Sequence, residues 1–247
     1  MLTIAHIDTN CLDQVNRFVD LPYRLYADCP QWLPPPRDHE AGYLNRQAHP
    51  FYEHSEADFF LAVRDGRDVG RIAVLAHAPS HELYGVSESH FYLFECEDDQ
   101  EAAAALFAQA ATWAKAQGHN HLAGPLGFGL LDPLHLLVDG FDYPQVTTMS
   151  VYNHEYYPQL LEAVGLAPKG NDIASYHLDV EQLCLPGWVH ELAETIPQKN
   201  ELYVSGLGSL DEVAMLGPLA LQQMAGEMGN TLAHRKRLSD PADAAHD

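Results

Sequence analysis

Residues 58–78, DFFLAVRDGRDVGRIAVLAHA, are two apolar β runs joined by Asp65-Gly66. An Asp-Gly pair between such runs favours a tight hairpin, because both turn residues need positive φ angles that aspartate and glycine tolerate. The stretch therefore predicts two antiparallel strands, one ending near Arg64 and the next beginning near Arg67. This hairpin is the clearest local unit of the chain, and the other elements are placed outward from it.

A β–α–β crossover is predicted directly after the hairpin. Residues 90–97, HFYLFECE, predict a third strand, and residues 121–126 predict a strand that follows a long alanine-rich helix. Asp98 and Glu101 have the spacing of a capping box at the start of that helix, and Gly118 is a natural stop. The apolar stripe of the helix consists of Leu106, Phe107, Ala110, Trp113 and Ala114. Because such crossovers join parallel strands, part of the sheet should be parallel.

Weaker patterns extend on both sides of this unit. Residues 2–7 predict an opening strand, and Asp8 or Thr9 is expected to cap the helix that follows it. The prolines of residues 28–36 then stop regular structure, because proline fixes φ and has no N–H to donate. The other predicted elements are a helix over 156–164 ending at Gly165, a strand over 172–180, a helix over 188–195, a strand over 202–207 and a helix over 211–228.

The chain is strongly acidic, with 13 Lys and Arg against 35 Asp and Glu, a formal net charge of −22. A field of this sign repels phosphates and anionic lipid, so neither a nucleic acid nor a membrane surface is expected as a partner. The excess of acidic residues is therefore interpreted as a contribution to the solubility of the protein. The four cysteines form no Cys-x-x-Cys pair, and neither a signal peptide nor a bilayer-spanning apolar run is present. A cytoplasmic location is therefore expected.

Several short motifs follow one another in the first 180 or so residues. They are 49–52 (HPFY), 69–72 (VGRI), 91–95 (FYLFE), 124–125 (GP), Asp132, 139–142 (DGFD), 152–157 (YNHEYY), 160–161 (LL) and 165–166 (GL). Together with the order of strands and helices, they resemble a bacterial GNAT-like family of unassigned function, where GNAT stands for GCN5-related N-acetyltransferase. The resemblance implies an α/β fold with a central mixed β-sheet flanked by helices.

The same resemblance implies a domain organisation. Residues 1–182 are predicted to be a GNAT-like domain, and residues 183–233 a partial second GNAT-like unit or a packing stub. Residues 234–247 have no apolar face and are expected to be a flexible tail. Family members usually continue into a complete second unit, so the chain is interpreted as a tandem type with its second unit mostly missing. The working cofactor site could then lie in the missing half.

In a GNAT enzyme, a glycine-containing loop at the start of the long helix holds the pyrophosphate of acetyl-CoA. The corresponding residues here are 95–102, ECEDDQEA, with five acids, no glycine and no basic residue. Carboxylates satisfy a helix N-terminus themselves and repel a diphosphate. The segment is therefore interpreted as a capped helix start and not as a phosphate-binding loop.

The resemblance also assigns candidate catalytic and cofactor-binding residues. Tyr156 and Tyr157 lie where many GNAT enzymes place a tyrosine general acid, which protonates the leaving thiolate. Alternatively, these two aromatic side chains pack in the core. The residues expected to bind acetyl-CoA or another acyl-CoA, and to align its thioester, are Leu93, Phe94, Glu95 and Asn153. The last of these would equally serve as the N-cap of the following helix.

The segment after the crossover strand is expected to shape a substrate pocket. The candidate pocket residues are Gly124, Pro125, Asp132, Phe141 and Asp142. The carboxylates would suit a cationic amine, although a solvated loop explains them too, and close backbone packing explains the glycine. No metal site is expected, because the pairs His77/His81 and His119/His121 have no third ligand beside them.

Two functions are therefore open. The leading hypothesis is a GNAT-like N-acyltransferase that moves an acyl group from acyl-CoA to a small amine. The alternative is a non-catalytic GNAT-like module that binds a ligand or a protein and has lost the CoA pyrophosphate loop. A homodimer is compatible with both.

Overall fold

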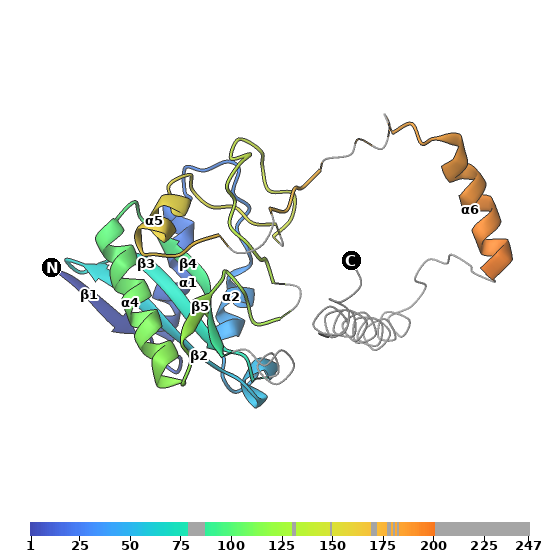
Figure 1. The fold of residues 1–247 in the computed structure, drawn as a ribbon. Coiled ribbons are helices and arrows are strands. Elements are labelled where there is room, and N and C mark those ends of the chain that lie inside the picture. Colours follow the sequence, from blue (N-terminus) through green and yellow to red (C-terminus); the bar gives the residue numbers. More distant parts are fainter. Residues whose placement is uncertain are drawn as a thin grey trace, which may run out of the picture. The chain divides into compact units, whose positions relative to one another are not determined.

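A five-stranded mixed sheet forms the centre of the first of two structural units, Met1–Asn171 and Asp172–Asp247, in the computed structural model (Figure 1). The structure describes residues 1–78, 87–129, 132–148, 150–168, 172–176, 179, 181 and 183–200. The strands are β1 (Leu2–His6), β2 (Glu56–Arg64), β3 (Arg67–Ala76), β4 (Glu88–Cys96) and β5 (His121–Ala123). Their order in the sheet follows the sequence; β1 to β4 are antiparallel neighbours, and β5 runs parallel to β4.

The order of the elements is the one expected for a GNAT-like fold. A strand and a helix precede an antiparallel hairpin, and a long helix then connects two parallel strands before a shorter helix. The prediction of a mixed α/β sheet flanked by helices is therefore confirmed.

The β2–β3 hairpin has the turn that Asp65-Gly66 predicts. Asp65 has a φ of 50° and Gly66 a φ of 83°, so both lie in the left-handed region that a type I′ turn requires. Arg64 pairs with Arg67 directly across the turn. The turn sets the first two residue pairs, and an irregularity at Ala62/Val63 then shifts the register of the remaining pairs. Most residues of the two strands are buried.

Helices α4 (Gln100–Ala116) and α5 (Tyr157–Ala163) pack on one face of the sheet (Figure 1). Every residue of the predicted apolar stripe of α4 is buried. The N-cap is Asp99 and not the predicted Asp98, because the Asp99 carboxylate accepts a hydrogen bond from the Ala102 N–H at 3.1 Å. Gly118 has a φ of 81° just after the helix, as a C-terminal stop requires.

The opposite face is covered by α1 (Leu12–Leu25), α2 (Arg37–Leu44) and the short 3-10 helix η1 (Pro50–Glu53). The predicted cap of α1 by Asp8 or Thr9 is wrong. Cys11 occupies the N-cap position and makes no side-chain capping bond. The carboxylate of Asp8 instead accepts a hydrogen bond from the Asn10 N–H at 3.0 Å, which forms a turn before the helix begins.

Two other elements differ from the sequence-based expectation. The crossover strand β5 ends at Ala123, short of the predicted residue 126, although the Leu126 N–H still donates to the Phe91 carbonyl at 3.0 Å. Residues 172–176 have no regular structure, so the predicted strand over 172–180 is wrong for these residues; residues 177, 178 and 180 lie outside the described part.

The second unit contains α6 (Gly187–Asn200), which includes the helix predicted over 188–195. The elements predicted over 202–207 and 211–228, and the tail over 234–247, lie outside the described residues. The domain boundaries at residues 182 and 233 stay a prediction.

Replacing Asp99 with alanine should lower the free energy of unfolding by about 1 kcal/mol, the usual effect of losing an N-cap side chain. Urea denaturation at neutral pH measures this change. Asp98→Ala is the matched control, since this neighbouring side chain is exposed and lies one position before the cap. Equal destabilisation by the two variants would contradict the assignment of Asp99 as the cap.

Candidate active site

Strand β4 contains a bulge where two of its residues, Leu93 and Phe94, face Ile72 alone on β3. Leu93 has a φ of 49°, a left-handed conformation that is uncommon for a residue with a side chain. Because the bulge adds one residue, Tyr92 and Glu95 point to the same face of the sheet although they are three positions apart. The bulge therefore directs two polar side chains toward the face covered by α1 and α2.

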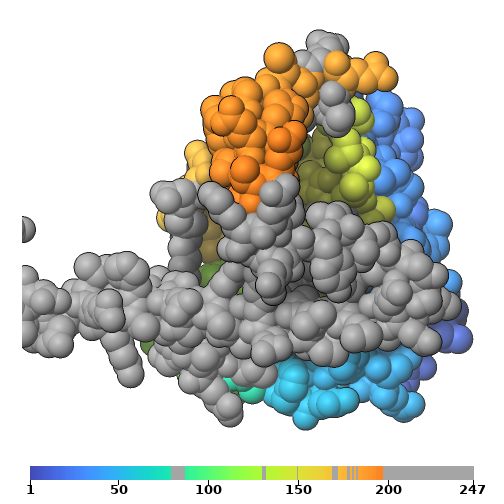
Figure 2. Space-filling view, turned by 90° about the vertical axis from the view of Figure 1, so that its right-hand side faces the viewer, coloured from blue at the N-terminus to red at the C-terminus, as the bar shows by residue number. Residues whose placement is uncertain are grey.

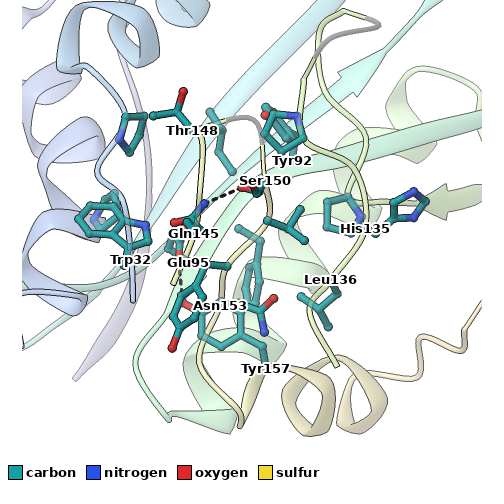
Figure 3. A pocket seen from close by; sticks show the side chains of 18 of the residues that line it. Trp32, Tyr92, Glu95, His135, Leu136, Gln145, Thr148, Ser150, Asn153 and Tyr157 are labelled. Carbon is teal, nitrogen blue, oxygen red and sulfur yellow. Dashed lines mark hydrogen bonds between the residues drawn. The ribbon is translucent and has the colours of Figure 1, made fainter. Parts of the chain in front are cut away.

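A cavity of about 140 Å³ lies beside this bulge. Its wall combines the end of α1, residues of β3 and β4, and the loop between β5 and α5. The polar residues of the wall include Glu40, Arg71, Tyr92, Glu95, Gln145 and Thr148. In Figure 3, Glu95 lies between Trp32 on one side and His135 and Leu136 on the other. An engineered cavity of roughly 150 Å³ holds one benzene molecule, so this space suits the head group of a ligand and not a long chain.

The outer wall of the cavity is a loop held against the N-terminal part of the chain. The Gln145 N–H donates to the Gln31 carbonyl at 2.8 Å, and the Leu33 N–H donates to the Gln145 side chain at 2.8 Å. Gln145 also donates to the Ser150 carbonyl at 2.6 Å. Figure 2 shows this loop in yellow-green beside the blue N-terminal segment. These hydrogen bonds hold the loop around Gln145 in place, and this loop forms the cavity wall opposite Glu95.

Glu95 is held through one of its two carboxylate oxygens. Oε2 accepts hydrogen bonds from the hydroxyls of Tyr26 at 2.8 Å and Tyr157 at 2.7 Å. The Cys96 N–H donates to the Tyr157 oxygen at 3.0 Å, which leaves the Tyr157 hydroxyl hydrogen for Glu95. Oε1 accepts no hydrogen bond from the described residues, and the Glu95 side chain lines the cavity.

Arg71 lies beside Glu95 with its side chain only 1% exposed. Its Nη1 and Nη2 donate to the carboxylate of Glu40 at 2.8 and 3.2 Å. Nη1 also donates to the Phe18 carbonyl at 2.9 Å. That carbonyl has no intrahelical partner because Pro22, four residues later in α1, has no N–H. A proline inside the helix thus provides an acceptor for a buried guanidinium.

Burial raises the pKa of Glu95, while the Arg71 charge and the hydrogen bonds from Tyr157 and Tyr26 partly oppose this rise. Burial also raises the pKa of Tyr157 well above its usual value. For Arg71, burial lowers the pKa, but the charge and hydrogen bonds of Glu40 outweigh it and the net shift is upward. The site therefore places a permanent cation between two carboxyl groups, and Glu95 takes up a proton more readily than an exposed glutamate does.

Six of the residues predicted for the site lie on the cavity wall: Leu93, Phe94, Glu95, Pro125, Asn153 and Tyr157. The side chain of Asn153 accepts from the Leu137 N–H at 2.7 Å and donates to the Leu137 carbonyl at 3.1 Å, which fixes the loop. The alternative of Asn153 as a helix N-cap is wrong, because Tyr156 occupies that position in α5.

The other five predicted site residues do not line the cavity: Tyr156, Gly124, Asp132, Phe141 and Asp142. The Tyr156 hydroxyl donates to a backbone carbonyl of β4 at 2.7 Å, and Asp132 accepts from the Tyr43 hydroxyl at 2.6 Å. A Cβ on Gly124 would lie 2.4 Å from the Phe91 carbonyl oxygen, so close packing accounts for that glycine. Functional roles for these five stay predictions.

The acidic start of α4 is paired with arginines. Glu97 contacts Arg24 at 2.7 Å and Arg67 at 2.6 Å, and Arg64 contacts Asp99 at 2.7 Å. The cap bond of Asp99 also occupies one of the N–H groups that a bound phosphate would need. These residues do not fit the diphosphate of CoA at this helix N-terminus.

Sequence reasoning missed Arg71, Glu40 and Tyr26 as members of the site. One signal was present: Arg71 lies inside the apolar run 69–75, VGRIAVL, and a charge in a buried strand must be paired. Its partners come from α2 and from the middle of α1, which the local pattern does not reveal.

Within the described residues, no group of three or more His, Cys, Asp or Glu side chains is arranged to hold a metal ion. In the pair His119/His121, the Nδ1 of His119 lies 2.8 Å from the Ser89 hydroxyl. None of the helices in the described part has the length and apolar character needed to cross a membrane.

Comparison with protein families finds no matching family model. Among curated proteins, the Bacterial ceramide synthase of Caulobacter vibrioides is 35% identical over 167 residues, which cover 67% of this chain and 43% of that protein. Protein YghO of Escherichia coli is 28% identical over 187 residues, which cover 76% of this chain and 47% of that protein. The chain thus spans less than half the length of these two relatives.

Among solved structures, a tandem GNAT protein from the clavulanic acid biosynthesis pathway aligns over 67% of this chain and 43% of its own, with 18% identity and a TM-score of 0.46. An aminoglycoside acetyltransferase from an uncultured soil metagenomic sample aligns over 72% of this chain and 95% of its own, with 12% identity and a TM-score of 0.46. Both are acetyltransferase-type proteins by name. The GNAT-like assignment itself follows from the strand order and the α4 crossover.

The raised pKa of Glu95 should appear in the pH dependence of stability. A carboxyl with a higher pKa in the folded state stabilises the fold below its unfolded-state pKa, and this contribution is lost as pH rises through the folded-state pKa. The unfolding free energy of the wild type minus that of Glu95→Gln should therefore decrease between pH ~4 and pH ~8. Urea denaturation of both proteins across this range measures the difference. A difference that stays constant or increases with pH would contradict the shift.

Proposed function

We propose that this chain forms the amine-binding, proton-accepting part of an N-acyltransferase that moves an acyl group from an acyl thioester to an amine. The observation that carries the proposal is Glu95, a half-buried carboxylate on the cavity wall, with a raised pKa and one oxygen that accepts no hydrogen bond from the described residues. A general base works best with a pKa near the working pH and with a lone pair in reach of the reacting atom. The pKa of Glu95 is shifted in that direction, one of its oxygens accepts no hydrogen bond from the described residues, and Tyr26 and Tyr157 orient the carboxylate.

The charge of the site favours a cationic ligand. Among the described residues of the wall, Arg71 is the one Lys or Arg side chain beside Glu40 and Glu95, so an ionised Glu95 leaves one negative charge uncompensated there. Apolar wall residues such as Trp32 and Phe94 reduce screening by water. An alkylammonium head group suits this environment, whereas a phosphate or carboxylate is repelled.

The name of the Caulobacter relative supports a narrower class of amine. A ceramide is the amide of a fatty acid and a long-chain amino alcohol, so a ceramide synthase joins an acyl group to an amino nitrogen. By similarity, we assign a long-chain amino alcohol as the acceptor. Its polar head fits the cavity of about 140 Å³, and its chain extends out of it.

The proposed reaction starts from the neutral amine, so the bound alkylammonium first gives up one proton to solvent. The steps that follow balance with a second proton that is transferred twice. The amine nitrogen attacks the thioester carbonyl carbon, and the new C–N bond forms as the carbonyl electrons move to oxygen. Oε1 of Glu95 takes the proton from nitrogen; the carbonyl then re-forms and the C–S bond breaks. The protonated Glu95 returns that proton to the departing thiolate, which gives an amide and a thiol.

The proposal assigns more specific roles to Tyr156, to Tyr157 and to the acyl donor. The Tyr157 hydroxyl hydrogen is directed at Glu95, so Tyr157 orients the base and is a poor choice for the general acid. Tyr156 lies off the cavity wall. Acyl-CoA stays the proposed donor, with its thioester near Leu93 and Phe94, but its diphosphate is not held by the N-terminus of α4.

A second function is favoured by the arginine-paired start of α4. A non-catalytic GNAT-like module would keep the cavity as a binding site for an amine while lacking a place for the CoA diphosphate. Such a module binds the amine without consuming a thioester. A cytoplasmic location and a homodimer stay predictions under both proposals.

Glu95→Gln should lower kcat for amide formation by on the order of 10²-fold or more, because Gln keeps the hydrogen bonds but cannot take a proton. The assay follows the amide by mass spectrometry, with palmitoyl-CoA as donor and sphinganine as acceptor. Glu97→Gln is the matched control: it is the same substitution two residues further on, in a side chain that lies off the cavity wall.

Two outcomes would count against the enzyme. Equal rates for the wild type and Glu95→Gln would remove Glu95 from the chemistry. If the wild type forms no amide at saturating donor and acceptor but is stabilised against heat by the amine alone, the binding module replaces the enzyme.

A further inference from the structure

Arg71 and Glu95 are direct neighbours across β3 and β4, on the face of the sheet that borders the cavity. An arginine and a glutamate in such a cross-strand position are placed to form an ion pair, and arginine–carboxylate pairs are frequently bidentate because the guanidinium fork matches both carboxylate oxygens. The structure shows no hydrogen bond between these two described side chains. Something therefore keeps the guanidinium away from Glu95.

The competing partner is Glu40, which comes from α2 and is itself buried. The Glu40 carboxylate accepts a hydrogen bond from Nη2 at 3.2 Å and another from Nη1, which also donates to the Phe18 carbonyl. Each terminal nitrogen of Arg71 therefore has a hydrogen-bond partner. Three of the five N–H groups of Arg71 are used, and its Nε is the one enclosed side-chain polar atom without a partner in the described part of the chain. An unpaired buried donor is costly, so the arrangement is held by the Glu40 contact and not by an optimal fit of Arg71 to all its neighbours.

We propose that Glu40 is a positioning residue: by binding both Nη atoms of Arg71, it holds the guanidinium off Glu95 and leaves Oε1 of Glu95 open to the amine. This inference rests on the proposed function, because it assigns Glu40 a role in preparing the base. Glu40 acts through Arg71 and does not exchange protons with the substrate.

The groups that face Glu95 define what releasing Arg71 would do. They are Arg71 from β3, Glu40 from α2, Tyr26 after α1 and Tyr157 from α5. Without the Glu40 charge, Arg71 can turn to Glu95 and occupy Oε1. The same change removes the repulsion of Glu40 and adds a closer positive charge, and both effects lower the pKa of Glu95. Glu95 would then be a weaker base, and its Oε1 would also be blocked by Arg71.

Glu40→Gln should therefore lower the pKa of Glu95 by about one unit or more, the size expected for an opposite charge brought into contact. Carbon-13 NMR of protein labelled at the glutamate carboxyl carbon measures that pKa directly, with the Glu95→Gln variant used to assign the signal. In the amide assay, the acid limb of the kcat profile should move to lower pH and kcat should fall about 10-fold or more.

The double variant Glu40→Gln with Arg71→Met should shift the pKa of Glu95 in the opposite direction. It removes the pair and its cation together, and replacing a whole buried ion pair by neutral side chains of similar volume is often tolerated. Burial then acts on Glu95 without a nearby positive charge, so its pKa should rise above the wild-type value by about one unit or more. A pKa that falls in the double variant as far as in Glu40→Gln would show that the loss of the Glu40 charge alone accounts for the effect, and would contradict the positioning role.

Glu40→Asp keeps the inference testable if Glu40→Gln does not fold. The shorter carboxylate keeps its charge but loses reach, so the pKa of Glu95 should fall in the same direction by a smaller amount. An unchanged pKa of Glu95 in every folded variant at residue 40 would overturn the positioning role.

The pKa of Glu95 measured by NMR and the rate of amide formation separate this inference from the proposed function. A shift of the Glu95 pKa in a protein that forms no amide leaves the positioning role intact and rejects the acyltransferase. Amide formation whose pH profile is the same in the wild type and Glu40→Gln supports the acyltransferase and rejects the positioning role.

Discussion

The buried guanidinium of Arg71 is the constraint on which this structure depends. A charge removed from water in the middle of a strand is destabilising by several kcal/mol unless its donors are paired, roughly 3–5 kcal/mol when one partner of such a pair is lost. Here the acceptors come from Phe18 in α1 and from Glu40 in α2. Both helices must therefore pack at this point of β3, and Pro22 is tolerated inside α1 because the carbonyl it leaves unpaired is used.

The bulge of β4 turns this packing constraint into a site. A regular strand would alternate Tyr92 and Glu95 between faces, because residues three apart lie on opposite sides. The extra residue at Leu93-Phe94 brings both to the face of Arg71, next to the gap where β5 has ended. Glu95 is thereby half-buried on the wall of the cavity, and partial burial accounts for its raised pKa.

The sequence predicts the parts of this fold that local patterns determine. The Asp-Gly hairpin, the apolar stripe of α4 and the glycine stop after it are set by neighbouring residues, and the structure confirms them. The cap of α4 is displaced by one residue, since Asp98 and Asp99 offer the same chemistry and only the backbone path selects between them. The hydrogen-bond network of the site, in contrast, joins residues that are far apart in the sequence. Arg71 and Glu40 are 31 positions apart, and Glu95 and Tyr157 are 62 apart, so no spacing rule links them.

The acidic stretch 95–102 looked like a single feature in the sequence, and the structure divides it in two. Glu95 is still inside β4, where the pleat and the bulge place its side chain in the cavity, whereas Glu97 and Asp99 follow the strand and are neutralised by surface arginines. Surface pairs of this kind are screened by water and salt over a Debye length of about 8–10 Å, so they have little influence on a buried carboxyl. The absence of a phosphate-binding start of α4 and the presence of a half-buried carboxyl at Glu95 are therefore independent properties. The first does not argue against the role proposed for the second.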